Sequence, residues 1–109
     1  MRLAAGCRSV AAVGVNCVDP HHAAPLLRSA GEALLAACAS REPPVLICYP
    51  NSGEGWDKQM RCWVEAPGVS EPAPFAAAAR EWVAAGARMV GGCCRTTPEH
   101  IAELRRQLL

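Results

Sequence analysis

Residues 89–98, MVGGCCRTTP, decide the fold that this sequence predicts. The first two residues are typical of the end of a buried strand, and the two glycines release the backbone from the steric limits that a Cβ imposes. Thr97 is a candidate N-cap, and Pro98 suits the first position of a helix. Cys93 and Cys94 are therefore expected at the carboxyl end of a strand, just before a helix, where α/β proteins place their chemistry.

A second stretch, residues 11–20, AAVGVNCVDP, repeats this order of apolar strand, glycine, polar residue, cysteine and proline. Cys17 at one strand end and the pair Cys93-Cys94 at another give three candidate thiolate ligands. Zinc takes four ligands, and catalytic sites keep one position open. The three cysteines therefore predict a catalytic zinc site, whereas two small buried thiols are the simpler alternative for the pair.

Alternating strands and helices predict an α/β fold with a parallel sheet. Strands are expected over residues 10–17, 45–49 and 87–90, and helices over residues 21–40, 75–85 and 98–108. The inward helix positions are expected to be Leu26, Leu27, Ala30, Leu34, Leu35 and Cys38, then Phe75, Ala78, Trp82 and Val83, then Ile101, Leu104 and Leu108. Pro25 is acceptable only in a first helical turn, and Gly86 is the expected C-terminal stop of its helix.

The loop after the second predicted strand carries polar and aromatic side chains. Asn51, Ser52 and Glu54 either order this loop or line a substrate site, since turns use such residues routinely. Trp56 and Trp63 either pack or stack on a cationic ligand. Residues 58–72 exceed an ordinary connection in length, which favours a lid-like functional loop.

Composition narrows the class of protein. The chain has 109 residues, 51% of them hydrophobic and 19% charged, with a formal net charge of +1. These values indicate a globular protein with no nucleic-acid or membrane partner. No apolar run approaches the ~20 residues of a membrane span, and the N-terminus is a poor secretory signal, so we expect a cytoplasmic protein.

The chain has seven cysteines, an odd number that argues against a secreted disulfide scaffold. Outside the three candidate ligands, cysteines are expected to pack or to be incidental; these are Cys7, Cys38, Cys48 and Cys62. The histidines His21, His22 and His100 are expected in solvated, capping or structural roles rather than as ligands. A thiol redox protein is a further alternative, but the C-x-x-C spacing is missing.

Three motifs together resemble the homocysteine S-methyltransferase family: GVNC at 14–17, YPNSGE at 49–54 with Trp56-Asp57, and GGCCRTTPEHI at 91–101. The resemblance covers nearly the whole chain and is greatest to the branch that uses S-methylmethionine or S-adenosylmethionine. It implies a (β/α)8 barrel, which typically needs about 250 residues. Residues 1–109 would then be a single homocysteine-binding-type domain fragment, the C-terminal portion with the last three βα units of an incomplete TIM-type barrel.

The resemblance also implies the chemistry. Cys17, Cys93 and Cys94 match the zinc ligands of the family, and one Zn²⁺ with an open fourth position would take the sulfur of homocysteine. The zinc-bound thiolate would accept a methyl group from a sulfonium donor and give methionine. A sulfonium donor carries an activated methyl and leaves as a neutral molecule, so no catalytic acid or base is assigned.

The family's front part should carry an Asp-Gly-Gly motif and the groups that hold the amino-acid end of homocysteine. Those groups are not found in this sequence, so no substrate-binding residue is assigned. A truncated zinc-binding remnant without methyltransferase activity is the alternative function. Three βα units also leave strand surface uncovered, so we expect self-association or loose packing.

Overall fold

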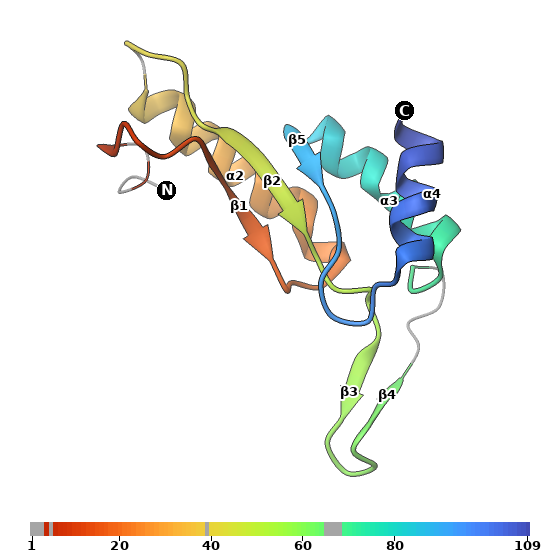
Figure 1. Ribbon diagram of the computed structural model, residues 1–109. Helices are drawn as coiled ribbons and strands as arrows, with labels where there is room; N and C mark the ends of the chain where they lie inside the picture. The colour runs from red at the N-terminus through yellow and green to blue at the C-terminus, as the bar shows by residue number, and fades with distance from the viewer. Residues whose placement is uncertain (1–3, 5, 39, 65–68) are drawn as a thin grey trace.

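A three-stranded parallel sheet forms the centre of the molecule (Figure 1). The computed structural model describes residues 4, 6–38, 40–64 and 69–109. The strands lie in the order β1-β2-β5. One helix follows β1, a second precedes β5 and a third follows β5. The main elements are β1 (Ala12–Asn16), α2 (Pro20–Ala37), β2 (Val45–Tyr49), α3 (Pro72–Ala84), β5 (Ala87–Val90) and α4 (Pro98–Leu108). The predicted α/β class and parallel pairing are confirmed.

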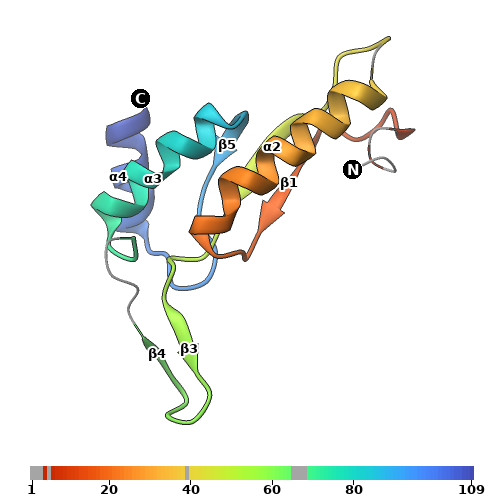
Figure 2. The ribbon, with the colours of Figure 1, turned by 180° about the vertical axis from the view of Figure 1, so that it is seen from behind.

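One face of the sheet is packed against helices. In β1 and β2, Val13 pairs with Leu46 and Val15 with Cys48, and side chains at paired positions share a face. Leu46 and Cys48 are buried in the core. Seen from both sides, α2 runs along this face (Figures 1 and 2).

The opposite face of the sheet is open in the part of the chain that the structure describes. Ile47 lies at its centre, paired with Gly14 of β1 on one side and Met89 of β5 on the other. Met89 is 52% exposed. Because the parallel sheets of globular proteins are normally covered on both faces, this face lacks its usual packing layer.

Helix α2 begins earlier than its sequence pattern suggested. Asp19 is the N-cap, its side chain accepts a hydrogen bond from the backbone N–H of His21, and Pro20 occupies the first turn. Pro25 therefore lies inside the helix, and the prediction that confined it to the first turn was wrong. Without an N–H, Pro25 cannot donate the helical hydrogen bond to the carbonyl of His21.

Some apolar positions that were predicted to face inward are exposed. Leu26 is 43% exposed, Leu35 68%, Val83 44% and Ile101 49%. Other positions predicted to face inward are buried, among them Leu27, Leu34 and Trp82. The prediction missed buried alanines beside them, namely Ala23, Ala24, Ala76 and Ala79. Helical periodicity predicted the apolar side of each helix, but the neighbouring elements decide which of its residues are covered.

Helices α3 and α4 form a second packed unit beside β5. The buried ring of Phe75 makes edge-on contacts with Trp82, at a centroid distance of 5.2 Å, and with His100, at 5.1 Å. Trp82 Nε1 donates a hydrogen bond to the carbonyl of Pro20, which joins α3 to the start of α2. His100 Nε2 donates to the carbonyl of Ser70, so the structural role predicted for His100 is confirmed.

The expected lid-like connection is partly an antiparallel hairpin. Strands β3 (Gly55–Asp57) and β4 (Cys62–Val64) pair with Trp56 opposite Trp63, and the hairpin projects away from the sheet (Figure 1). The side chains of Trp56 and Trp63 lie outside what the structure describes, so their stacking role stays a prediction. Among the described helices, none is long and apolar enough to cross a membrane.

Candidate metal centre

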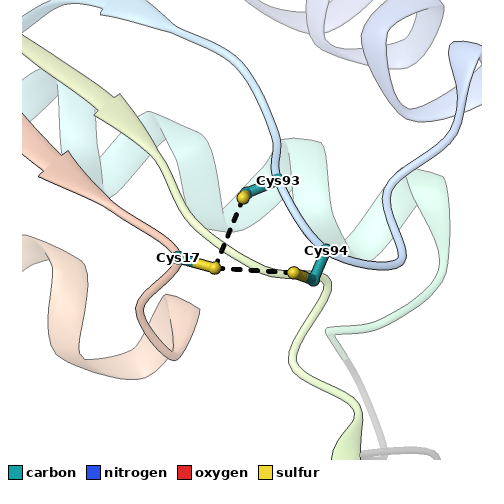
Figure 3. A group of neighbouring side chains, drawn as sticks. All are labelled: Cys17, Cys93 and Cys94. Carbon is teal, nitrogen blue, oxygen red and sulfur yellow. Dashed lines mark hydrogen bonds between the residues drawn. The ribbon is translucent and has the colours of Figure 1, made fainter.

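Three cysteine side chains from two separate loops meet at the carboxyl edge of the sheet (Figure 3). Cys17 Sγ lies 3.4 Å from Cys93 Sγ and 3.4 Å from Cys94 Sγ. All three sulfurs lie within 4.8 Å of one another. The structure therefore brings together the three thiols that the sequence singled out, across 76 and 77 positions of the chain. We refer to them as the cysteine cluster.

The backbone at Cys17 turns sharply to direct its side chain toward the pair. Cys17 has a φ of 55°, in the left-handed region that non-glycine residues rarely occupy. Its N–H donates a hydrogen bond to the carbonyl of Tyr49, so the turn is still attached to the sheet. Strained residues of this kind persist only where their surroundings fix them, and they gather at functional sites.

The segment after β2 holds both cysteine loops. On one side, the backbone N–H of Asn51 donates to the carbonyl of Val18 at 2.9 Å. On the other side, the N–H of Cys93 donates to the carbonyl of Pro50 at 2.8 Å, and the N–H of Ser52 donates to the carbonyl of Cys94 at 3.0 Å. Residues 49–52 therefore extend the sheet pairing beyond the regular strands and fix the spacing of the two loops.

The two glycines before the cysteine pair have different roles. A Cβ on Gly92 would collide with the side chain of Thr96, 2.7 Å from Thr96 Cβ. Thr96 Oγ1 in turn donates a hydrogen bond to the carbonyl of Cys93. A Cβ on Gly91 would make only an ordinary contact, at 3.7 Å from Tyr49 Cβ. The turn therefore needs a glycine at position 92 for this close approach. The residue of this loop with a left-handed backbone is Arg95, with a φ of 65°.

The polar residues that follow β2 order this edge of the sheet. Ser52 is fully buried, and Glu54 N–H donates to its hydroxyl. Glu54 accepts a hydrogen bond from Arg95 Nε at 2.8 Å, so the carboxylate pairs with the residue directly after the cysteine cluster. The loop-ordering alternative stated for these residues is therefore supported by their contacts.

The other cysteines do not join the cluster. Cys38 and Cys48 are buried, and Cys7 and Cys62 are exposed elsewhere. Burial raises the pKa of the Cys48 thiol to about 11, which keeps it protonated. His21 pairs with Asp19 at the start of α2, as expected for a capping position.

The donor set fits a zinc ion. Zinc binds thiolates at about 2.3 Å, which in a tetrahedral site separates two sulfurs by about 3.8 Å. Two of the sulfur separations, both 3.4 Å, are close to this value. Within the described residues, no further His, Cys, Asp or Glu joins the three sulfurs. Such a site offers three protein ligands and leaves one position for another molecule.

The sequence did not specify how the cluster is held. The side-chain amide of Asn51 touches both cysteine loops, with Nδ2 3.2 Å from the carbonyl oxygen of Cys17 and Oδ1 3.1 Å from the N–H of Cys94. The sequence analysis named Asn51 as a residue that orders the loop or lines a substrate site, but it did not predict contacts with both cysteine loops. The close approach of Gly92 to Thr96 had no signal beyond the glycine itself.

Comparison with known proteins gives a consistent result. The homocysteine S-methyltransferase family matches residues 1–108. Homocysteine S-methyltransferase 3 of Zea mays is 41% identical over 94% of this chain and 28% of its own length. The Bacillus subtilis homocysteine S-methyltransferase YbgG is 36% identical over 89% of this chain and 27% of its own.

A solved structure also matches. The crystal structure of the homocysteine methyltransferase MmuM from Escherichia coli, in an oxidized form, superposes with a TM-score of 0.68 at 33% sequence identity. The match covers 96% of this chain and 27% of that chain. The chain thus spans little more than a quarter of the length of the proteins that it matches.

Proposed function

Because this chain belongs to the homocysteine S-methyltransferase family, we propose that it carries the metal centre for transfer of a methyl group to the sulfur of homocysteine. Residues 1–109 would form one homocysteine-binding-type domain, its C-terminal portion. The observation that carries the proposal is the convergence of three thiols, which no further His, Cys, Asp or Glu of the described residues joins. The ligands we propose are Cys17, Cys93 and Cys94, around one Zn²⁺.

We propose that the fold corresponds to the last three βα units of a (β/α)8 barrel. The three strands are parallel and adjacent in chain order, and among the described elements helix α2 lies along one face of the sheet while the other face is open. In a barrel the other face would point inward and the cysteine cluster would lie at the carboxyl end, where barrel enzymes carry their active sites. The open sheet face supports this assignment.

The proposed methyl transfer needs no catalytic side chain beyond the three metal ligands. Cys17, Cys93 and Cys94 would hold the zinc ion, which would keep a coordinating thiol deprotonated, the form in which a thiol is nucleophilic. Three cysteine thiolates supply negative charge, which keeps an incoming sulfur electron-rich. A sulfonium donor, S-methylmethionine or S-adenosylmethionine, gives up its methyl as its sulfur becomes neutral, so no side chain has to donate a proton. The product of the transfer to homocysteine would be methionine.

The alternative function is zinc binding without methyl transfer. The chain covers 27–28% of the relatives named above and of the MmuM structure. A protein that keeps the cysteine cluster without the rest of the pocket would bind zinc without turnover. A zinc-binding remnant without methyltransferase activity is this alternative. In either case, a reducing cytoplasmic setting would keep the thiols available as ligands.

The test measures metal content and turnover together. Wild type, Cys93→Ser and the control Cys62→Ser are loaded with zinc, freed of excess metal and assayed for methyl transfer from each sulfonium donor to homocysteine. We expect about one zinc per chain in wild type and Cys62→Ser, and loss of it in Cys93→Ser. Zinc with turnover supports the methyltransferase, zinc without turnover supports the remnant, and a metal-free wild type contradicts both.

A further inference from the structure

We propose that Asn51 is a positioning residue that holds the two ligand loops of the metal centre at the correct spacing. The inference rests on the proposed zinc site and concerns a residue outside the three proposed thiolate ligands. Its carboxamide lies between the loop of Cys17 and the loop of Cys93 and Cys94. A small change in the spacing of these loops would separate the sulfurs.

Both ends of the carboxamide are used. Nδ2 donates a hydrogen bond to the carbonyl of Cys17 at 3.2 Å, and Oδ1 accepts one from the N–H of Cys94 at 3.1 Å. Since an amide has a donor end and an acceptor end, only one orientation of the group satisfies both loops. The backbone N–H of the same residue also donates to the carbonyl of Val18. Asn51 is therefore tied to each loop.

The bond to Cys17 acts where the backbone is strained. Cys17 has a left-handed φ of 55°, and its carbonyl is the group that Asn51 binds. Such a conformation costs of order 1–3 kcal/mol and depends on its surroundings to persist. Loss of the carboxamide would free this turn to relax, which would move the Cys17 sulfur away from the pair.

The bond to Cys94 acts on the other ligand loop. The N–H of Cys94 points to Asn51, while its carbonyl accepts from the N–H of Ser52. Both backbone groups of this ligand are thus fixed by residues 51–52. Groups that orient metal ligands typically change metal affinity 10–100-fold when they are removed. We expect Asn51 to fall in that range.

The experiment compares zinc affinity in three forms of the whole chain: wild type, Asn51→Ala and the control Asn16→Ala. Asn16 is exposed and directly precedes Cys17, so it matches Asn51 in residue type and closeness to the cluster. Competition with a chromophoric chelator gives the affinity, and circular dichroism checks the fold. We expect Asn51→Ala to fold and to bind zinc about 10–100-fold more weakly, with Asn16→Ala close to wild type. Affinity of folded Asn51→Ala within twofold of wild type overturns the proposal.

A second readout separates positioning from general support of the fold. In the cobalt-loaded protein, the sulfur-to-cobalt charge-transfer band reports how many thiolates bind, and we expect Asn51→Ala to lose intensity at saturating cobalt. Asn51→Asp is isosteric and keeps the acceptor for Cys94, but it loses the donor for Cys17. Its added negative charge alone would tighten cation binding, so weaker zinc binding isolates the lost hydrogen bond. Unchanged or tighter binding by Asn51→Asp, or failure of both Asn51 variants to fold, overturns the assignment.

Failure of the proposed function would be recognised separately. If wild type binds no zinc, the metal centre is wrong, but convergence of the thiols can still be measured. Diamide takes two hydrogens from a pair of close thiols and leaves a disulfide, and Cys17 Sγ lies 3.4 Å from Cys94 Sγ. Asn51→Ala should slow formation of this disulfide and Asn16→Ala should not. Equal rates in all three forms would overturn the positioning role.

Discussion

At the scale of single residues, the site depends on the backbone conformation of Cys17 and on the absence of a side chain at Gly92. Cys17 turns through a left-handed backbone, and Gly92 lets the other loop pass close to Thr96. The three sulfurs meet because both loops are bonded to residues 49–52. Thiol type and spacing made the cluster predictable from the sequence. The hydrogen bonds that hold it could not be predicted, since they link residues far apart in the chain.

Thiol reactivity should separate the cluster from the remaining cysteines. In the native metal-free chain at pH 8, we expect iodoacetamide to modify the cluster and exposed Cys62, but not Cys48, which is fully buried with a pKa raised to about 11. Since the thiolate is the reactive form, a high pKa suppresses alkylation. Zinc should protect the cluster alone. Peptide mass mapping checks this, and equal zinc protection of Cys62 would argue against a specific site.

Substitution of the two glycines should give different results. Gly92→Ala should lower the free energy of unfolding by about 1–3 kcal/mol, because the added methyl overlaps the side chain of Thr96. Gly91→Ala, with ordinary contact distances, should stay close to wild type. Urea unfolding of both variants measures the difference. Equal stability of the two would show that the loop does not need the close approach.

At the scale of the elements, the strands and the start of α4 were predictable. Helix α3 begins at Pro72 rather than at Phe75, and the covered faces of the helices were only partly predicted. The predicted ranges 87–90 and 98–108 match β5 and α4. Gly86 ends the helix before β5, and Thr97 and Pro98 are residues typical of the start of a helix. The exposed side chains of Leu35 and Ile101 show what periodicity lacks: it finds an apolar stripe but not the neighbour that covers it. The β3–β4 hairpin was missed because its strands are only three residues long.

Helix α2 offers a direct test of its internal proline. Pro25→Ala should raise the free energy of unfolding, by about 1–3 kcal/mol, because it restores the hydrogen bond to the carbonyl of His21 and removes a steric clash. Pro98→Ala is the matched control, since proline at the first position of α4 interrupts no helical hydrogen bond. Chemical unfolding measures both. A Pro25→Ala chain no more stable than wild type would mean that α2 is already kinked to accommodate the ring.

At the scale of the whole molecule, the chain is more open than a compact domain of its size. Its radius of gyration is 15.0 Å, against about 13 Å for a compact domain of 100 residues. Its accessible surface is 7005 Å², against about 5,800 Å² for a folded monomer of this mass. Met89, Ile101 and other large apolar side chains contribute to this surface. Both results agree with a sheet built to be covered on its second face.

We therefore expect the chain alone to self-associate or to pack loosely. Apolar surface that stays in contact with water favours association, and the outer edges of β1 and β5 have no strand partner among the described residues. Light scattering over a hundredfold range of concentration should show the average mass rising. A dilute monomer with a sharp, cooperative thermal transition would contradict this expectation and show that three βα units suffice as a domain.

The most direct test of the metal centre is X-ray absorption at the zinc edge of the zinc-loaded chain. The account predicts three sulfur ligands at about 2.3 Å, with one lighter ligand in the remaining position. A first shell with two sulfurs or fewer would contradict it, because Cys17, Cys93 and Cys94 would then not share one ion.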